Sequence, residues 1–174
     1  EDLNPAHMDY GALKELFYEC GDELMGLKIR TSKDIAKEFG FEGLKATGAM
    51  ADRLGVSIMV LPTDPPGEME GLLSYLRPGD VMSHMYMNIG STIVDEEGHV
   101  KDCAWKARER GVLFEAADAQ AHFGFSTAVP AIAEGFLPDF IATDGTRNSM
   151  LKRPTTFSLA MQMARYEDMG IPFT

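Results

Sequence analysis

Apolar and polar residues follow two different patterns along the chain. Short apolar runs are typical of buried strands, and longer stretches with apolar residues every three or four positions are typical of helices. The patterns predict strands at Leu24–Arg30, Ser57–Leu61, Asp80–Met85, Val112–Ala116 and Phe140–Thr143. They predict helices at Tyr10–Glu19, Gly43–Leu54, Glu68–Leu76, Ala104–Arg110, Thr127–Glu134 and Thr156–Met169.

Predicted strands and helices follow one another in turn, which is typical of an α/β protein with a parallel sheet and helices on its faces. Gly55, Gly111 and Gly135 stand where helices are expected to end. Five strands fit either a small open sheet or the later part of an eight-stranded barrel, which usually needs about 250 residues. Since the chain has no internal repeat and no Gly/Ser linker, we expect residues 1–174 to form one domain. We also expect this domain to be cut at both ends.

The composition limits the classes of partner. Sixteen basic and twenty-seven acidic residues give a net charge of −11, which disfavours nucleic acids and anionic membranes. The sequence has neither an apolar run of about 18 residues nor the pattern of a signal peptide, so we expect a cytoplasmic protein. Cys20 and Cys103 stand too far apart in sequence for a paired-cysteine motif and are expected to be buried thiols.

The carboxyl ends of parallel strands form the active face of many α/β proteins. Asp144 directly follows the apolar run Ile141–Thr143, so it is either a metal ligand or proton carrier, or the N-cap of a helix. Other polar residues expected near strand ends are Arg30, Asp64, Ser83 and Asp118, of which Asp64 in a Pro-rich loop is expected to shape a turn.

Lys28 lies between two apolar residues of a predicted strand. If it is buried, desolvation would lower its pKa and free the amine as a nucleophile. If its strand lies at an edge of the sheet, it would point to solvent instead.

Two histidines are candidates for chemistry. His84, within MSHMYM, suits zinc binding or general-base catalysis, or it is a core histidine that bonds a backbone carbonyl. His122 follows a predicted strand among aromatic residues and suits a functional role. His7 and His99 are expected to be exposed.

Five phrases of the sequence together resemble the amidohydrolase superfamily, in particular its deacetylase and dihydroorotase-like branch. They are GLKIR, LRPGDVMSHMY, ARERGVLFEAA, HFGFSTAVPAI and GFLPDFIATD, and they stand in the family's order. The resemblance implies part of a TIM-type (β/α)8 barrel, about strands four to eight. It also implies one or two divalent metals, usually zinc, and hydrolysis of an amide, cyclic amide or ester.

The resemblance assigns roles to individual residues. It implies that Lys28, which is commonly carboxylated in the family, His84 and Asp144 bind metal, and that Asp144 also carries the proton of the attacking water. His122 and Arg30 are expected on the substrate side. Where the family has a histidine after the fifth strand, this chain has Leu61. Since a leucine cannot ligate metal, a binuclear site would be one ligand short.

Three hypotheses follow. The first is a metal hydrolase acting on a small molecule, with a complementary barrel fragment or a second copy of the chain covering the exposed strand edges. The second, favoured by Leu61, is a catalytically silent relative that serves as an assembly or regulatory subunit. The third is a lyase that uses Lys28 as a Schiff base.

Overall fold

The chain forms one parallel sheet in a computed structural model, which describes residues 4–119, 122–147, 149 and 157–172. The strands lie in sequence order, β1-β2-β3-β4-β5, and every pairing is parallel. Their bounds are Gly26–Arg30, Ser57–Leu61, Val81–Met82, Leu113–Ala117 and Phe140–Ala142. The predicted α/β class and all five predicted strands are therefore confirmed.

The α-helices include α1 Tyr10–Glu19, α2 Lys33–Ala36, α3 Glu42–Leu54, α4 Met69–Ser74, α5 Asp102–Glu109, α6 Phe125–Ala133 and α8 Leu159–Asp168. Short 3₁₀ turns lie at Pro5–His7 and Lys37–Phe39. All six predicted helices occur, although the predicted start of the last one, Thr156, lies outside the described residues. The sequence reading missed α2, which is a single turn of KDIA and too short for a periodic signal. No helix in the described ranges has the length and apolar character to cross a membrane.

The third strand is shorter than predicted. The pattern indicated Asp80–Met85, but β3 ends at Met82, and His84 has a positive φ of 55°. The amides of Ser83 and Met85 still bond the neighbouring strands, to Val60 O at 2.9 Å and Glu115 O at 3.0 Å. The left-handed residue between them turns the chain while these bonds hold both sides.

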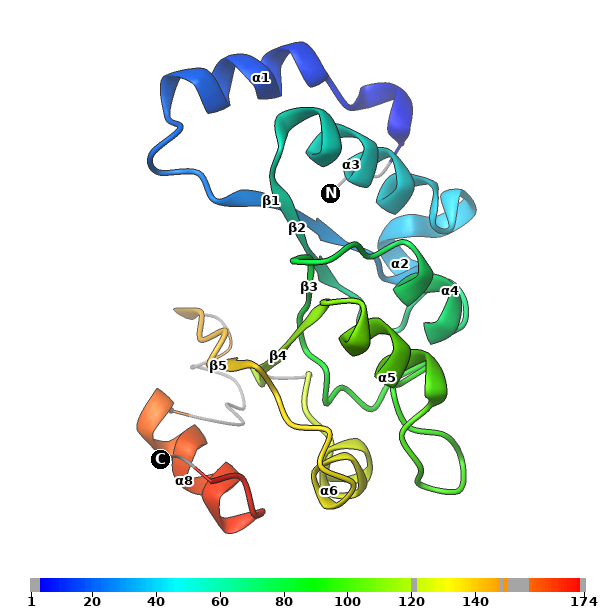
Figure 1. Ribbon diagram of the computed structural model, residues 1–174, viewed down its shortest axis with the longest axis vertical. Coiled ribbons are helices and arrows are strands. Elements are labelled where there is room, and N and C mark those ends of the chain that lie inside the picture. The colour runs from blue at the N-terminus through cyan, green and yellow to red at the C-terminus, as the bar shows by residue number, and fades with distance from the viewer. Residues whose placement is uncertain (1–3, 120–121, 148, 150–156, 173–174) are drawn as a thin grey trace.

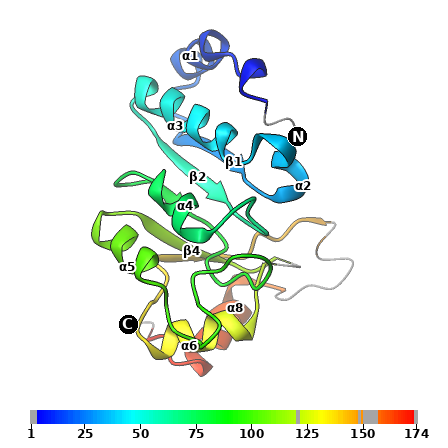
Figure 2. The ribbon, with the colours of Figure 1, turned by 90° about the vertical axis from the view of Figure 1, so that its right-hand side faces the viewer.

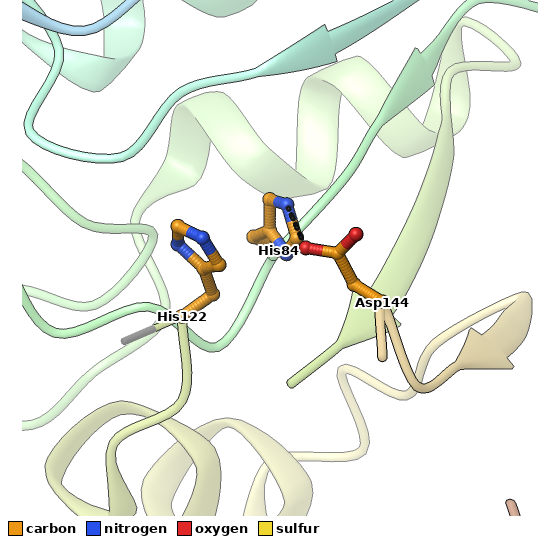
Figure 3. Close-up of side chains that lie close together, drawn as sticks. All are labelled: His84, His122 and Asp144. Carbon is orange, nitrogen blue, oxygen red and sulfur yellow. Dashed lines mark ion pairs between the residues drawn. The ribbon is translucent and has the colours of Figure 1, made fainter. Parts of the chain in front are cut away.

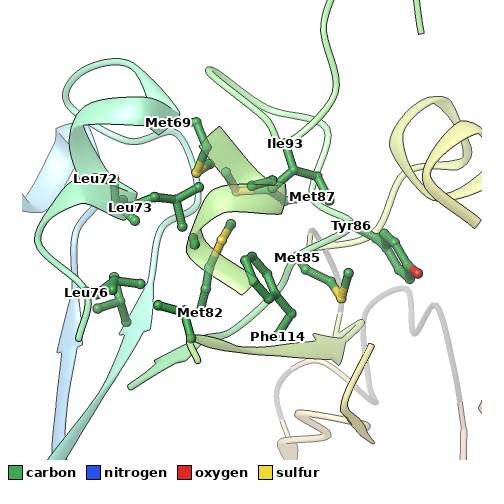
Figure 4. Packing of buried hydrophobic residues seen from close by; sticks show 14 of the residues in the cluster. Met69, Leu72, Leu73, Leu76, Met82, Met85, Tyr86, Met87, Ile93 and Phe114 are labelled. Carbon is green, nitrogen blue, oxygen red and sulfur yellow. The ribbon is translucent and has the colours of Figure 1, made fainter. Parts of the chain in front are cut away.

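Helices α3, α4 and α5 lie along one side of the sheet (Figures 1 and 2). Alternation along each strand directs one set of side chains toward these helices, including Ile29, Val60, Met82 and Phe114. Figure 4 shows the resulting core, in which four methionines pack with leucines and Phe114. Met69, Met82, Met85 and Met87 are fully buried, which confirms the predicted core role for these methionines.

The opposite set of side chains lies on the inner face of the sheet. Lys28, Met59, Val81, Leu113 and Phe140 line an open groove there of about 650 Å³. Leu113 and Phe140 are each 37% exposed. The described part of the chain thus covers one face of its sheet and leaves much of the other open.

Candidate metal centre

Three side chains from three strand ends converge at the carboxyl edge of the sheet. His84 follows β3, His122 follows β4 and Asp144 follows β5. One potential ligand atom from each lies within 4.8 Å of the others. Figure 3 shows the two imidazole rings and the carboxylate close together, with a dashed line between His84 and Asp144.

His84 is buried and has one nitrogen without a hydrogen bond. Its Nδ1 lies 2.5 Å from the carbonyl oxygen of Ala117, which fixes this nitrogen as the protonated one. Its Nε2 has no hydrogen-bond partner among the described residues, and Asp144 Oδ2 lies 3.7 Å away. The predicted alternative, a core histidine that bonds a backbone carbonyl, therefore explains Nδ1 but not Nε2.

Burial, together with the charge of the neighbouring His122, lowers the pKa of His84 to about 4. The imidazole is therefore neutral at neutral pH, which is the form that binds metals.

His122 is half-buried and stacks on His84, with ring centroids 4.1 Å apart. Its Nδ1 lies 2.7 Å from the hydroxyl oxygen of Thr63. Burial is the main cause that lowers the pKa of His122; Asp144 opposes the shift, and the charges of Arg30 and Lys28 add to it. His122 is thus held in place and neutral.

Asp144 ends the fifth strand segment in a left-handed conformation, with φ of 46°. The alternative role predicted for Asp144 was the N-cap of a helix. In the turn that follows Asp144, the backbone amide of Ser149 donates to the hydroxyl of Thr146 at 3.1 Å, so Thr146 supplies a side-chain cap there. Residues other than glycine rarely adopt positive φ, and such residues concentrate at functional sites. His84 and Asp144 both adopt it.

Lys28 is exposed on β1, which is the second of the two predicted alternatives, a lysine on an edge strand that points to solvent. Alternation places its side chain on the inner face of the sheet, and β1 is an edge strand. Arg30 is half-buried at the end of the same strand, and its Nε donates to Ser32 Oγ at 3.2 Å.

The other predicted strand-end residues have structural partners. Asp64 pairs with Lys33 at 3.0 Å and has a positive φ of 49°, which confirms its predicted turn role. The buried Asp118 accepts hydrogen bonds from Tyr166 and Arg165 of α8. His7 and His99 are exposed as predicted, whereas Cys20 and Cys103 are half-buried rather than buried.

The sequence reading missed two residues near the site. Thr63 holds His122, and no local pattern marks a threonine in a Pro-rich loop as a partner of a residue 59 positions later. Glu115 is buried on β4 and accepts a hydrogen bond from Ser83. A glutamate inside an apolar strand, VLFEA, is the sequence signal by which Glu115 could have been identified.

The chemistry of the group fits a divalent metal. Two imidazoles and a carboxylate are common zinc ligands, and catalytic zinc sites typically have three protein ligands and an open position. The buried Nε2 of His84, which has no hydrogen-bond partner among the described residues, is the atom that a metal would satisfy.

Comparison with known proteins agrees with the resemblance that the five sequence phrases indicated. No protein-family model matches the chain. A deacetylase of Agrobacterium fabrum is 29% identical over 166 residues, which is 95% of this chain and 40% of the relative. A deacetylase of Brucella anthropi is 27% identical over 166 residues, 95% of this chain and 41% of the relative. The chain thus spans less than half the length of these curated relatives.

Two solved structures have the same fold. The crystal structure of a dihydroorotase matches 98% of this chain and 44% of its own with a TM-score of 0.84 and 31% identity. An adenine deaminase matches 98% of this chain and 46% of its own, with a TM-score of 0.91 and 23% identity, which indicates a shared fold. The five-stranded sheet and its helices are therefore part of a (β/α)8 barrel. Taken with the deacetylase relatives, these matches confirm the resemblance of the chain to the deacetylase and dihydroorotase-like branch of the amidohydrolase superfamily.

Proposed function

We propose that the chain is part of a metal-dependent hydrolase of the amidohydrolase type, corresponding to about barrel strands four to eight. The convergence of His84, His122 and Asp144 carries this proposal, because it brings together ligands suited to a divalent metal. The names of the curated relatives favour an N-acetyl compound as the substrate, and cyclic amides and esters are the alternatives. Zinc is the expected metal.

In the proposed reaction a water molecule attacks the carbonyl carbon and the bond from that carbon to nitrogen breaks. A bound divalent metal would supply a lowered pKa for the water and polarisation of the carbonyl. Asp144 accepts the proton of the attacking water and returns it to the leaving nitrogen, so the products are a carboxylic acid and an amine. Its position beside His84 supports this role, since Oδ2 lies 3.7 Å from the ring nitrogen.

Arg30 and Lys28 supply positive charge on the side of the site at β1. Both act electrostatically on His122. We propose that Arg30 helps to bind a negatively charged part of the substrate. Lys28 is exposed on the described sheet. Its role as a ligand of a second metal therefore requires that another part of the molecule covers it.

A silent relative is the second candidate, and Leu61 is the observation that favours it. Leu61 ends β2 at the place where the family has a metal-binding histidine, and it is buried with 9% of its surface exposed. The Schiff-base alternative loses the burial that it requires, since Lys28 is exposed.

The test measures zinc content and hydrolysis of a panel of N-acetyl amino acids, cyclic amides and esters. We expect Asp144→Asn to abolish turnover, because an amide cannot accept the proton, while zinc is retained at least in part. We expect His84→Ala to lose both zinc and turnover. His99→Ala is the matched control, since His99 is exposed and lies outside the group. If neither variant differs from this control, the proposal of a metal hydrolase is wrong.

A further inference from the structure

We propose that His122 is a direct ligand of the metal, that it replaces the ligand lost at Leu61, and that His84, His122 and Asp144 together hold a single ion. The inference rests on the proposed metal site and differs from the substrate-side role that the resemblance implies for His122. It assigns Thr63 as the positioning residue for His122.

The end of β2 supplies no ligand to the group. Leu61 has no donor atom, and the next acidic residue, Asp64, pairs with Lys33 at 3.0 Å. Among the described residues the only His, Cys, Asp or Glu side chains that gather closely enough for an ion are His84, His122 and Asp144. The loop after β4 therefore supplies His122 in place of the ligand that is missing at Leu61.

Both imidazoles have the arrangement expected of metal ligands. A metal-binding histidine usually donates its second ring N–H to a carbonyl, a carboxylate or water, which fixes the tautomer and the ring orientation. Nδ1 of His84 bonds Ala117 O at 2.5 Å, and Nδ1 of His122 bonds Thr63 Oγ1 at 2.7 Å. A carbonyl oxygen only accepts, so Nε2 of His84 is left to bind an ion. For His122 we assign Thr63 Oγ1 as the acceptor from Nδ1–H, which leaves its Nε2 for the ion as well.

Stacking of the two rings keeps a ring nitrogen of His84 close to a ring nitrogen of His122, within 4.8 Å. The ring planes differ by 27° and the centroids lie 4.1 Å apart. Two neutral imidazoles and one carboxylate leave an open position for water, as in catalytic sites with two histidines and one carboxylate. Among the described His, Cys, Asp and Glu side chains, these three gather closely enough to bind an ion, so they account for one ion.

In the experiment, the 174-residue chain is loaded with Zn²⁺ or Co²⁺, and the number of ions bound per chain and their affinity are measured. X-ray absorption then gives the number of imidazoles bound to each ion. We expect one ion with two imidazole ligands in the wild type. We expect His122→Ala to weaken binding more than Thr63→Val, which should lose about 10- to 100-fold in affinity. Lys28→Ala should keep one ion per chain, and added imidazole should restore Co²⁺ absorption to His122→Gly.

The outcomes separate this inference from the proposed function. A wild-type chain that binds no Zn²⁺ or Co²⁺ would contradict both. A single bound ion with only one imidazole, or unchanged affinity in His122→Ala, would overturn the inference alone and return His122 to the substrate side. Two bound ions, one of them lost in Lys28→Ala, would also overturn it. The imidazole count in the wild type does not depend on the folding of any variant.

Discussion

At the scale of single residues, the site depends on side chains that the backbone places in unusual conformations. His84 and Asp144 are two of the five described non-glycine residues with positive φ. Such conformations cost about 1–3 kcal/mol each and persist where surrounding structure holds them. The hydrogen bonds on both sides of His84 are part of that structure, because they tie its neighbours to β2 and β4.

Asp118 joins the end of β4 to helix α8 by a buried polar network. It is 1% exposed and lies 2.6 Å from the hydroxyl of Tyr166. Burial raises the pKa of its carboxyl, although Tyr166 and Arg165 oppose the shift. A carboxylate in this position is favourable only while these donors surround it.

We therefore expect Asp118→Ala to lower the free energy of unfolding by about 3 kcal/mol, because buried donors would lose their acceptor. Tyr166→Phe should cost about 1 kcal/mol, since one hydrogen bond is lost. Glu96→Ala is the control, at an exposed turn, and should change stability by less than about 0.5 kcal/mol. Urea denaturation measures all three, and an Asp118→Ala chain as stable as the control would show that the network does not hold α8.

At the scale of elements, the parallel sheet and its outer helices follow from alternation along the strands. β1 approaches β2 closely at Gly26, where a Cβ would lie 2.4 Å from the carbonyl oxygen of Ser57. Gly48 lies inside α3, where an added Cβ would meet no atom within 4 Å. The same substitution should therefore have opposite effects in the two elements.

We expect Gly26→Ala to lower the free energy of unfolding by about 1–3 kcal/mol, because a backbone atom of β2 must move. Gly48→Ala should raise it by about 0.5–1 kcal/mol, because alanine favours the helix and restricts the unfolded chain. Denaturation midpoints of the two variants and the wild type measure the difference. Equal shifts in the same direction would contradict the close approach of β1 and β2.

At the scale of the whole molecule, the inner face of the sheet leaves apolar side chains exposed. Met25 is 94% exposed, and Leu113 and Phe140 lie exposed on the groove. Open sheet edges and apolar surface promote pairing with another chain. The matched relatives are about twice as long, which favours a complementary part of the barrel as the natural cover.

We expect the 174-residue chain alone to self-associate through this face. Leu113→Lys should shift the population toward the 19.1 kDa monomer in sedimentation velocity, because a charge on the groove opposes apolar contact. Tyr18→Lys is the control, since Tyr18 is 90% exposed on α1 and lies outside the groove. If both variants associate equally, the inner face is not the contact surface.

Much of this protein was determined by local features of its sequence. Short apolar runs predicted five strands, and apolar residues every three or four positions predicted six helices. Both patterns arise because strands buried in a sheet, and the helices that cover it, must present apolar side chains to the core. The turn role of Asp64 and the core role of the buried methionines were likewise readable from their neighbours. His84 was recognisable as a histidine within the apolar phrase MSHMYM, and Asp144 because it directly follows an apolar strand.

Tertiary structure decided which of these residues act together. Only the parallel order of the strands brings the ends of β3, β4 and β5 to one place, and only there does Thr63 meet His122 across 59 positions of sequence. Burial of Lys28 was not decided by its apolar neighbours. It depends on whether another element covers the inner face, and no local pattern along β1 carries that information.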